Sequence, residues 1–569
     1  MTAGANALGI DVAGLDVPAF LAAARLAFVA AAVAFLFLAR TRGPGFLLGG
    51  VVAANAFAWA VTNHPLQRIY ALGPSRDRIG NLALVQVVAA GNSPLHTEQV
   101  GQLHFEPFWG LLVAALSGWS PDRVLALYPF LPLFVMTGFV LTLFWGLGAR
   151  EAAWADAGAS AEAAWSPWER VLAAGFATLL ASAPLDFAGT YRVPWAMTFL
   201  LKPNHALGLV LLPVFLRVFA SIRGWPSRVA AGALLHLIGW AFVLHMAYVC
   251  VGLVLYAALP LLARRAGARR DALDVAVVLG TNLLIVSPYL FMLLVGYPFL
   301  TPSLAATIHP SSPHLLETTL RHGPVFLLGV WGAWIAYRRG DRLGRAFSTQ
   351  VAAAHLVWVG YLALSALQQA RERDEVFYWT RFLTAAAAGV GAWDLARRSA
   401  AVLGRAWAPS QRAAAVAMLA LPWSLPAWWG PLRLDSYFAG SLAPLPRELR
   451  EPMEFLRGGT DRRAVVAGDR DVAKWVAALG ARRVLVTPIL HMQRDYLERD
   501  RLERMLMLEG DGAVVRAAAA RFGVRYLLVT PALLQRFGTT LDALRRRPHL
   551  HLAHLSGTPE EFVAVFELR

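Results

Sequence analysis

Apolar runs long enough to cross a lipid bilayer recur from about residue 20 to residue 430, and this feature limits the possible folds more than any other. A membrane-spanning helix needs roughly 17 to 25 predominantly apolar residues. Hydrophobic residues make up 57% of the chain and charged residues only 15%, whereas soluble domains contain about 25% charged residues. The composition therefore excludes a soluble enzyme over most of this length and predicts an α-helical, polytopic membrane protein.

The spans and the charges that flank them together predict about twelve crossings, because loops rich in Arg and Lys stay on the cytoplasmic side of a membrane. Twelve crossings place every arginine cluster on one side if residues 229–263 form a helical hairpin. A single long, tilted helix over these residues is the alternative. The predicted spans are 20–39, 44–62, 123–148, 171–189, 206–222, 229–244, 247–263, 273–296, 324–337, 350–368, 382–396 and 413–430.

This topology predicts that the N-terminus, four loops and everything after residue 431 lie outside the cytoplasm. The four loops are 63–122, 186–205, 297–323 and 369–381. They are rich in Pro, His, Trp and acidic residues, as is typical of the face of a protein that carries its functional site. The net charge of +16 comes almost entirely from arginine, since Lys202 and Lys474 are the only lysines. We assign this charge to membrane orientation and expect no nucleic-acid partner.

Residues 431–569 form a second predicted domain, because charged residues become frequent after residue 431. Short β-type runs at 464–467, 484–487 and 524–530 alternate with amphipathic stretches at 471–479 and 531–545, which indicates a small α/β domain. No GxGxxG, P-loop or HExxH motif occurs in it. We expect a cap or scaffold on the extracytoplasmic side of a transmembrane domain that covers residues 1–430.

Asp77 stands out in the first outer loop, residues 63–122. It lies between Arg76 and Arg78, ahead of an apolar stretch at 82–90, and a second short apolar piece follows at 107–116. We expect both pieces to be helices that lie in the membrane interface or lean on the helical bundle. A carboxylate at this position can act as a general base that takes a proton from an acceptor hydroxyl. An ordinary Arg–Asp–Arg surface pair is the structural alternative.

The order and sidedness of several motifs resemble the GT-C glycosyltransferases, integral membrane enzymes that take a sugar from a polyprenyl-phosphate carrier. The resemblance covers residues from about 44 to the end, although the acidic pairs common in the family are absent at Asp77. It implies a GT-C-like transmembrane domain with Asp77 as the catalytic base. The motifs are Asp77 with Gly91–Pro94, Lys202–His205, Leu244–His245, Glu375–Phe382, and the C-terminal runs 463–466, 479–485 and 522–529.

The resemblance also implies a polyprenyl phosphate or diphosphate as the leaving group, and cations near the outer boundary would hold it. Arg381 is the first candidate, and Lys202 and Arg192 follow. A helix-end anchor that reaches the lipid headgroups is the alternative for Arg381. Asp186 and Glu375 are candidates for a second acid or an acceptor-positioning group, and a helix cap or an Asp186–Arg192 pair is the alternative for Asp186.

Three further residues, His205, His245 and Tyr378, are candidates for contacts to the sugar or the acceptor. The two histidines could equally bridge neighbouring helices by hydrogen bonds. Imidazole and carboxylate side chains also cluster in the first outer loop and are plausible metal ligands, but their spacing matches no known site. These metal candidates are His96, Glu98, His104 and Glu106. No cofactor is assigned, and a divalent metal is left open.

The sequence thus predicts an inverting glycosyltransferase of the cell envelope, with a lipid, glycan or protein acceptor. A multi-pass transporter or a lipid-linked-glycan flippase is the alternative, although no internal repeat is evident and few ionisable residues lie at mid-depth. A catalytically inactive scaffold is a third reading. The bias for Arg over Lys and the abundance of Ala favour a bacterial cytoplasmic membrane.

Overall fold

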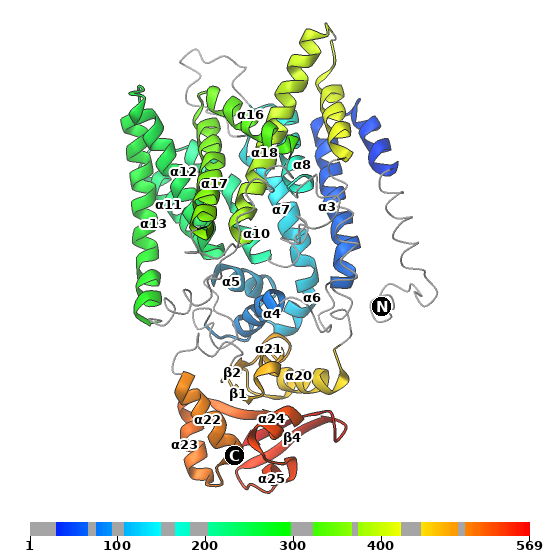
Figure 1. The fold of residues 1–569 in the computed structure, drawn as a ribbon, viewed down its shortest axis with the longest axis vertical. Coiled ribbons are helices and arrows are strands. Elements are labelled where there is room, and N and C mark those ends of the chain that lie inside the picture. The colour runs from blue at the N-terminus through cyan, green and yellow to red at the C-terminus, as the bar shows by residue number, and fades with distance from the viewer. Residues whose placement is uncertain are drawn as a thin grey trace. The chain divides into compact units, whose positions relative to one another are not determined.

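A computed structural model of the chain describes residues 30–66, 76–93, 107–148, 165–181, 203–296, 323–366, 374–404, 406–422, 445–486 and 496–569. The chain divides into two compact units, which are described separately (Figure 1). The first unit groups residues 1–65, 131–291 and 307–437, and the second groups 66–130 and 292–306 with 438–569. The prediction of a mostly helical chain with a small C-terminal sheet is confirmed.

The described helices of the first unit overlap the predicted spans, but α18 begins at Asp374, inside the predicted outer loop 369–381. Residues 20–29, 182–189 and 423–430 of the predicted spans lie outside the described residues. Several helices open on proline, whose fixed backbone angle suits the first turn of a helix. The helices are Ala30–Ala39, α3 (Pro44–Leu66), α7 (Leu131–Gly146), α8 (Pro167–Leu179), α10 (Pro203–Ala220), α11 (Trp225–Ala241), α12 (Val243–Leu262), α13 (Ala268–Gly296), α16 (Pro324–Arg338), α17 (Arg342–Ala366), α18 (Asp374–Val402) and a helix at 409–422.

Three helices within the described ranges are long and apolar enough to cross a membrane: Pro121–Gly146, His245–Leu262 and Ala268–Pro288. Shorter apolar helices accompany them at Ala30–Ala39, Pro44–Ala56, Ile79–Ala89 and Ala206–Ala220. Helices of this kind agree with a membrane location. The number of about twelve crossings stays a prediction.

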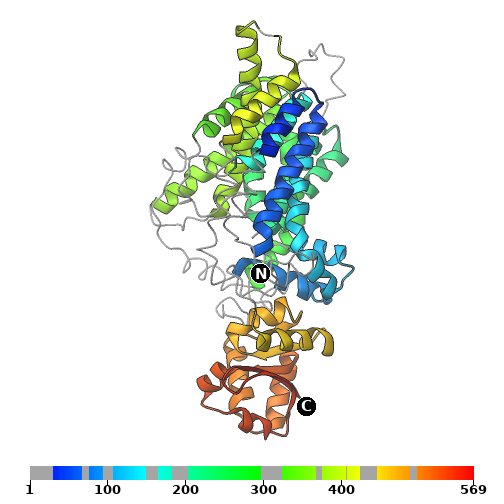
Figure 2. The ribbon, with the colours of Figure 1, turned by 90° about the vertical axis from the view of Figure 1, so that its right-hand side faces the viewer.

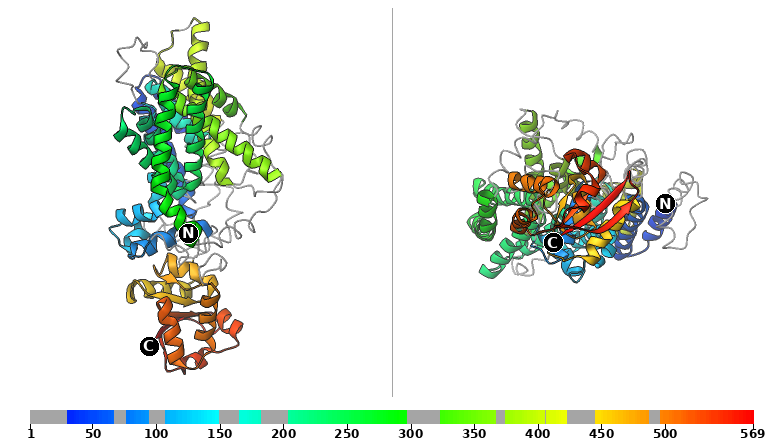
Figure 3. Two further views of the ribbon diagram at one scale, coloured as in Figure 1. Left: turned by 90° about the vertical axis from the view of Figure 1, so that its left-hand side faces the viewer. Right: turned by 90° about the horizontal axis from the view of Figure 1, so that it is seen from below.

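Residues 225–262 form a helical hairpin and not one long helix. Phe242 adopts an extended backbone (φ −164°, ψ 115°) and separates α11 from α12. The start of α11 and the end of α12 reach the same turn of α13, because Arg228 donates to Asp274 at 2.7 Å and Tyr256 donates to Asp271 at 3.2 Å. The prediction of a hairpin is therefore confirmed, and Figure 3 shows α11, α12 and α13 in green.

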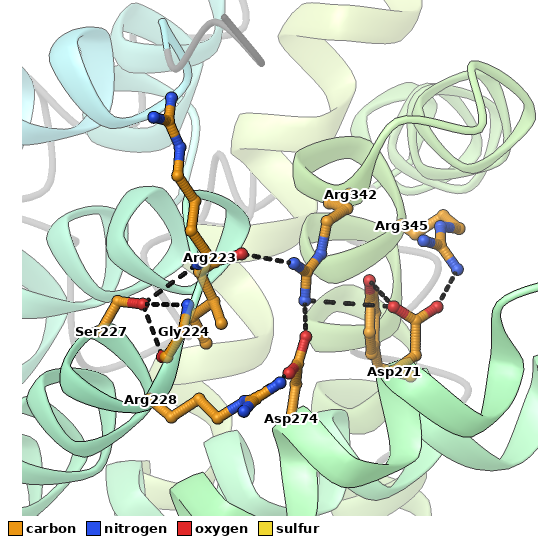
Figure 4. A network of polar contacts seen from close by, with 10 residues as sticks. Arg223, Gly224, Ser227, Arg228, Asp271, Asp274, Arg342 and Arg345 are labelled. Carbon is orange, nitrogen blue, oxygen red and sulfur yellow. Dashed lines mark hydrogen bonds and ion pairs between the residues drawn. The ribbon is translucent and has the colours of Figure 1, made fainter. Parts of the chain in front are cut away.

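Buried ion pairs join the ends of several helices in the first unit (Figure 4). The Asp274 side chain is 0% exposed and accepts hydrogen bonds from Arg228 Nε at 2.7 Å and Arg342 Nη2 at 2.6 Å. Arg342 also donates to the carbonyl oxygen of Ile222 at 3.1 Å, just after α10. Because a buried charge without a partner is costly, these pairs hold the ends of α10, α11, α13 and α17 together.

Other arginines that the sequence places on one side gather at the same end. Arg345 donates to Asp271 at 2.7 Å, and Arg339 after α16 pairs with Glu169 in the first turn of α8. We call this the arginine-rich end, defined by Arg228, Arg339, Arg342 and Arg345. Since α10 and α12 end here, their first turns lie at the opposite end of the unit.

The second unit contains the helices of the first predicted outer loop: α4 (Arg76–Ala89), α5 (Pro107–Leu116) and α6 (Pro121–Leu127). Helices are thus present where the sequence predicts them at 82–90 and 107–116. Every residue from Ile79 to Ala90 is buried, because α4 packs against α5, α6 and α21 (Arg470–Ala478). Gln86 Nε2 donates to the Pro121 carbonyl at 3.0 Å, which ties α4 to the start of α6.

The C-terminal part of this unit is an α/β fold on a five-stranded sheet of order β2-β1-β3-β5-β4. Strand β1 runs parallel to β2 and β3, whereas β5 runs antiparallel to β3 and β4. The strands are β1 (Val465–Gly468), β2 (Arg483–Val484), β3 (Val524–Val529), β4 (Leu550–Gly557) and β5 (Phe562–Leu568). The helices are α20 (Arg447–Gly459), α21, α22 (Tyr496–Leu508), α23 (Gly512–Phe522), α24 (Pro531–Phe537) and α25 (Leu541–Arg545).

Strands β1 and β3 lie at the predicted runs 464–467 and 524–530, whereas β2 overlaps the run predicted at 484–487 only at Val484. The stretch predicted at 531–545 is two helices. Gly538, with a φ of 60°, ends α24 in the left-handed conformation that glycine adopts without strain. The β4–β5 hairpin is missing from the sequence prediction. Strand β4 interrupts its apolar residues with His551 and His554, so it contains no continuous apolar run.

A buried arginine connects the elements around β1 and β2. Arg482 is 1% exposed and donates to the Thr460 carbonyl at 2.7 Å, the Thr460 hydroxyl at 2.9 Å and the Arg457 carbonyl at 3.1 Å. Burial lowers the pKa of this guanidinium to about 10, because its partners are mostly neutral oxygens. The side chain thus fixes the end of α20 to the turn between α21 and β2.

Candidate functional site

Asp77 is the second residue of α4, in the second unit. A carboxylate in the first turn of a helix interacts favourably with the partial positive charge of that helix end. The rest of α4 is enclosed, so its packing fixes the position of the Asp77 backbone within this unit. The Asp77 side chain lies outside the described residues.

In the first unit, the opening turns of α10, α12 and α18 converge on His245. This histidine is the third residue of α12 and is 0% exposed. Its ring centroid lies 4.6 Å from that of Trp379 on α18, and a Cβ added to Gly208 on α10 would overlap its Nδ1. Gly208 therefore makes the room in which the imidazole lies. Tyr248, one turn further along α12, stacks on Trp379 at 5.7 Å.

Three nitrogen atoms of this cluster have no hydrogen-bond partner among the described residues. Both ring nitrogens of His245 and the indole Nε1 of Trp379 are buried and unpaired. A buried donor or acceptor without a partner costs about 1–3 kcal/mol, so native proteins seldom leave three of them together. The arrangement suits a ligand that supplies oxygen atoms to these nitrogens.

Arg381 follows Trp379 by two residues on α18 and is 2% exposed. The adjoining threonines hold this part of α18 against α17: Thr380 donates to the Ala354 carbonyl at 3.0 Å, and Thr384 lies 3.3 Å from His355 Nε2. A buried guanidinium in α18 adds positive charge to the end of the unit at which α10, α12 and α18 begin, and helix starts themselves favour anions. This end of the unit can therefore attract a phosphate.

Of the other predicted site residues, the structure describes the backbone of three and nothing of the rest. His205 is the third residue of α10, and Glu375 and Tyr378 lie in the first turns of α18, so the backbones of all three start at this end; their side chains are not described. The remaining predicted residues lie outside the described ranges. They are Asp186, Arg192, Lys202, His96, Glu98, His104 and Glu106.

Two residues of the cluster were not predicted from the sequence. Gly208 is one of several glycines in apolar runs, and nothing in its neighbourhood marks a close approach to a histidine. Trp379 lies inside the Glu375–Phe382 motif. Its position between the two candidate residues Tyr378 and Arg381 is the one sequence feature that points to a role in the site. As for metals, the part of the chain that the structure describes contains no group of three or more His, Cys, Asp or Glu residues able to hold an ion.

No protein-family model matches the chain, and no curated protein sequence matches it. Among solved structures, the chain is similar to the oligosaccharyltransferase of Archaeoglobus fulgidus. The enzyme AglB in complex with an inhibitory peptide and a dolichol-phosphate is 14% identical, with a TM-score of 0.43 over 84% of this chain and 69% of that chain. The apo form is 13% identical, with a TM-score of 0.45 over 91% and 74% of the two chains.

A third structure of the archaeal enzyme, in complex with Zn and sulfate, is 13% identical, with a TM-score of 0.41 over 89% of this chain and 72% of that chain. A likeness at this level does not extend to individual site residues. The functional reading of the cluster therefore depends on the chemistry of the side chains in this chain.

Proposed function

We propose that this protein is a membrane glycosyltransferase of the GT-C type. It transfers a sugar from a polyprenyl-phosphate-linked donor to a hydroxyl of a lipid, glycan or protein acceptor. The convergence of three helix starts on His245 and Trp379, with the buried Arg381 two residues after Trp379 on α18, is the observation that carries the proposal. It supplies unpaired donors and a buried cation at the end of the unit opposite the arginine-rich end.

The anionic leaving group explains why cations and N–H donors gather there. As the bond between the anomeric carbon and the phosphate oxygen breaks, negative charge grows on the phosphate, and fixed donors stabilise that charge most strongly in a dry site. Arg381 contacts the phosphate in this scheme, with Lys202 and Arg192 in support. His245, together with His205 and Tyr378, orients hydroxyl groups of the sugar or the acceptor.

Asp77 acts as the general base. It takes the proton of the acceptor hydroxyl, whose oxygen attacks the anomeric carbon from the face opposite the phosphate. One C–O bond forms as the other breaks, so the configuration at the anomeric carbon inverts. Asp186 or Glu375 positions the acceptor, and the involvement of a divalent metal is left open.

The reaction is placed on the extracytoplasmic face of a bacterial cytoplasmic membrane. The arginine clusters support this orientation, because basic loops stay in the cytoplasm and the helix starts around His245 lie at the other end of the same unit. Residues 431–569 then form an extracytoplasmic cap beside the transmembrane domain 1–430. The arginine network in Figure 4 is structural in this scheme.

The test compares lipid-linked sugars, by mass spectrometry, in a host that lacks this gene and in the same host carrying wild type, Asp77→Asn or Asp122→Asn. Asp122 is the matched control, since it lies in the same unit, is 78% exposed and pairs with Arg457. We expect the deletion and Asp77→Asn strains to accumulate one polyprenyl-phosphate sugar that wild type and Asp122→Asn clear. Clearance by Asp77→Asn would remove Asp77 from catalysis, and no accumulation in the deletion strain would favour a transporter.

A further inference from the structure

A groove lined by apolar residues runs between four helices of the first unit. None of the residues that line it belongs to the His245 cluster. The helices are Ala30–Ala39, α3, α8 and the helix at 409–422, and the cavity volume is about 370 Å³. Small side chains such as Ala32, Ala54 and Ala417 contribute to its walls. We call this the lateral groove.

The side chains that line the lateral groove are all apolar, so they offer no polar partner for a buried water. A buried water needs two to four polar partners, and every residue that lines the groove is apolar. Along α8 the lining extends from Val171 to Leu180, which is about 14 Å at the helical rise of 1.5 Å per residue. An extended hydrocarbon chain matches this combination of an apolar wall and an elongated shape.

One end of the groove is basic. Each helix that lines it has an arginine just beyond the lining, at the end shared with the arginine-rich end: Arg40 and Arg42 in the turn before α3, Arg170 in α8 and Arg412 in the helix at 409–422. The Ser410 hydroxyl donates to the Arg40 carbonyl at 2.6 Å, so the first and last of these helices meet there. Figure 2 shows the dark blue helix Ala30–Ala39 and α3 beside the yellow helix at 409–422.

The positive charge at this end is not neutralised within the described chain. None of Arg40, Arg42 and Arg412 forms an ion pair with a described carboxylate. The acids of the neighbouring helices are already engaged, because Glu169 pairs with Arg339 and Asp394 accepts from Arg397 and Arg398. The groove is therefore an apolar channel with arginines at one end that form no ion pair with a described carboxylate.

We infer that the lateral groove binds an anionic phospholipid of the surrounding membrane. One acyl chain lies in the groove, and the phosphate contacts Arg40, Arg42 and Arg412 at its basic end. Arginine binds phosphate oxygens through paired N–H donors, and basic pockets between helices on the cytoplasmic side of membranes bind anionic headgroups. The bound lipid fills a seam that the Ala30–Ala39 helix would otherwise leave open against α8.

The test uses the full-length chain, purified in detergent and stripped of lipid. It is titrated with phosphatidylglycerol or with phosphatidylcholine of identical acyl chains, and lipid retention is read by native mass spectrometry and by the midpoint of thermal unfolding. The headgroup variant is Arg40→Gln with Arg42→Gln, and its matched control is Arg269→Gln with Arg270→Gln, which removes two exposed arginines from the first turn of α13. The groove variant is Ala417→Phe, and its control is Ala34→Phe, an exposed position that does not line the groove.

We expect wild type and both controls to retain one phosphatidylglycerol and to gain about 2 °C or more in midpoint at saturating lipid. The headgroup and groove variants should each lose at least tenfold in apparent affinity. Equal binding of phosphatidylcholine would overturn headgroup recognition, and an unchanged response in both test variants would overturn the site. If polyprenyl phosphate displaces phosphatidylglycerol from wild type at equal concentration, the occupant is the carrier lipid and the phospholipid assignment is wrong.

Discussion

The imidazole ring of His245 lies against the indole ring of Trp379, with centroids 4.6 Å apart and an interplanar angle of 39°. This contact joins the first turn of α12 to α18, and it leaves three ring nitrogens buried without partners. An apolar ring in place of the imidazole would pack against Trp379 equally well. The two ring nitrogens of His245 are the hydrogen-bonding groups that an apolar ring would remove.

We expect His245→Phe to keep the fold and lose activity. Phenylalanine preserves the contact with Trp379 but has no donor or acceptor, and removal of one such group from a preorganised site costs about 100-fold in rate. The measurement is sugar transfer in a single turnover, with thermal unfolding as a check on folding. His236→Phe is the matched control, because His236 is also buried and lies beside Trp240 in α11. An equal loss in both variants would assign His245 a structural role.

Asp274→Asn should destabilise the first unit by about 3 kcal/mol, because it leaves Arg228 and Arg342 buried without their shared carboxylate. The midpoint of thermal unfolding in detergent reports the loss. Asp542→Asn gives the comparison, since Asp542 is 72% exposed and its pair with Arg545 should contribute little. If Asp274→Asn unfolds at the wild-type temperature, the network in Figure 4 does not hold the helix ends together.

Arg482→Lys should loosen the second unit by about 2 kcal/mol. Lysine places three donors at one point and cannot reproduce the spread of contacts that the guanidinium makes to Thr460 and Arg457. Hydrogen exchange should rise at the end of α20 and in β2. Arg504→Lys, at a side chain that is 64% exposed, should leave exchange unchanged. Wild-type protection in Arg482→Lys would show that a single ammonium group suffices.

Acid should weaken the C-terminal sheet through His549, which is 0% exposed. Burial lowers the pKa of His549, and the nearby Arg547 and Arg516 lower it further against the opposing effect of Asp511. The unfolded chain, with a histidine pKa of about 6.5, therefore binds the proton more readily than the folded chain. Stability is unaffected above about pH 6.5 and falls as the pH drops through that value toward the lower folded pKa.

Hydrogen exchange in β4 between pH 7 and pH 5.5, corrected for intrinsic rates, measures this effect. His549→Phe should flatten the pH dependence, whereas His551→Phe, at an exposed position on the same strand, should keep it. A pH dependence that survives in His549→Phe would assign the acid sensitivity to another group.

Local patterns in the sequence predicted much of the fold. Apolar periods with arginine flanks predicted the hairpin of α11 and α12, because charge sidedness does not depend on distant contacts. The helices at α4 and α5 and the strands β1 and β3 were likewise visible in short windows. Strand β4 was not, since its half-exposed edge alternates apolar and polar residues.

Relationships between distant segments could not be predicted in this way. The grouping of residues 66–130 with 438–569 depends on the packing of α4 against α21, and neither helix contains a signal for the other. The room that Gly208 makes for His245 is equally invisible, because a missing side chain in an apolar run has no pattern. Asp77 and Arg381 were singled out by charge and by family resemblance, and their roles remain predictions.

The packing of α4 has a consequence for how the protein is made. Residues 79–90 are enclosed partly by α21, which leaves the ribosome only after nearly five hundred residues have been synthesised. Until then the side of α4 that faces α21 lacks its final partner, although α5 and α6 can already pack against α4. The helix that carries Asp77 therefore completes its packing only near the end of translation.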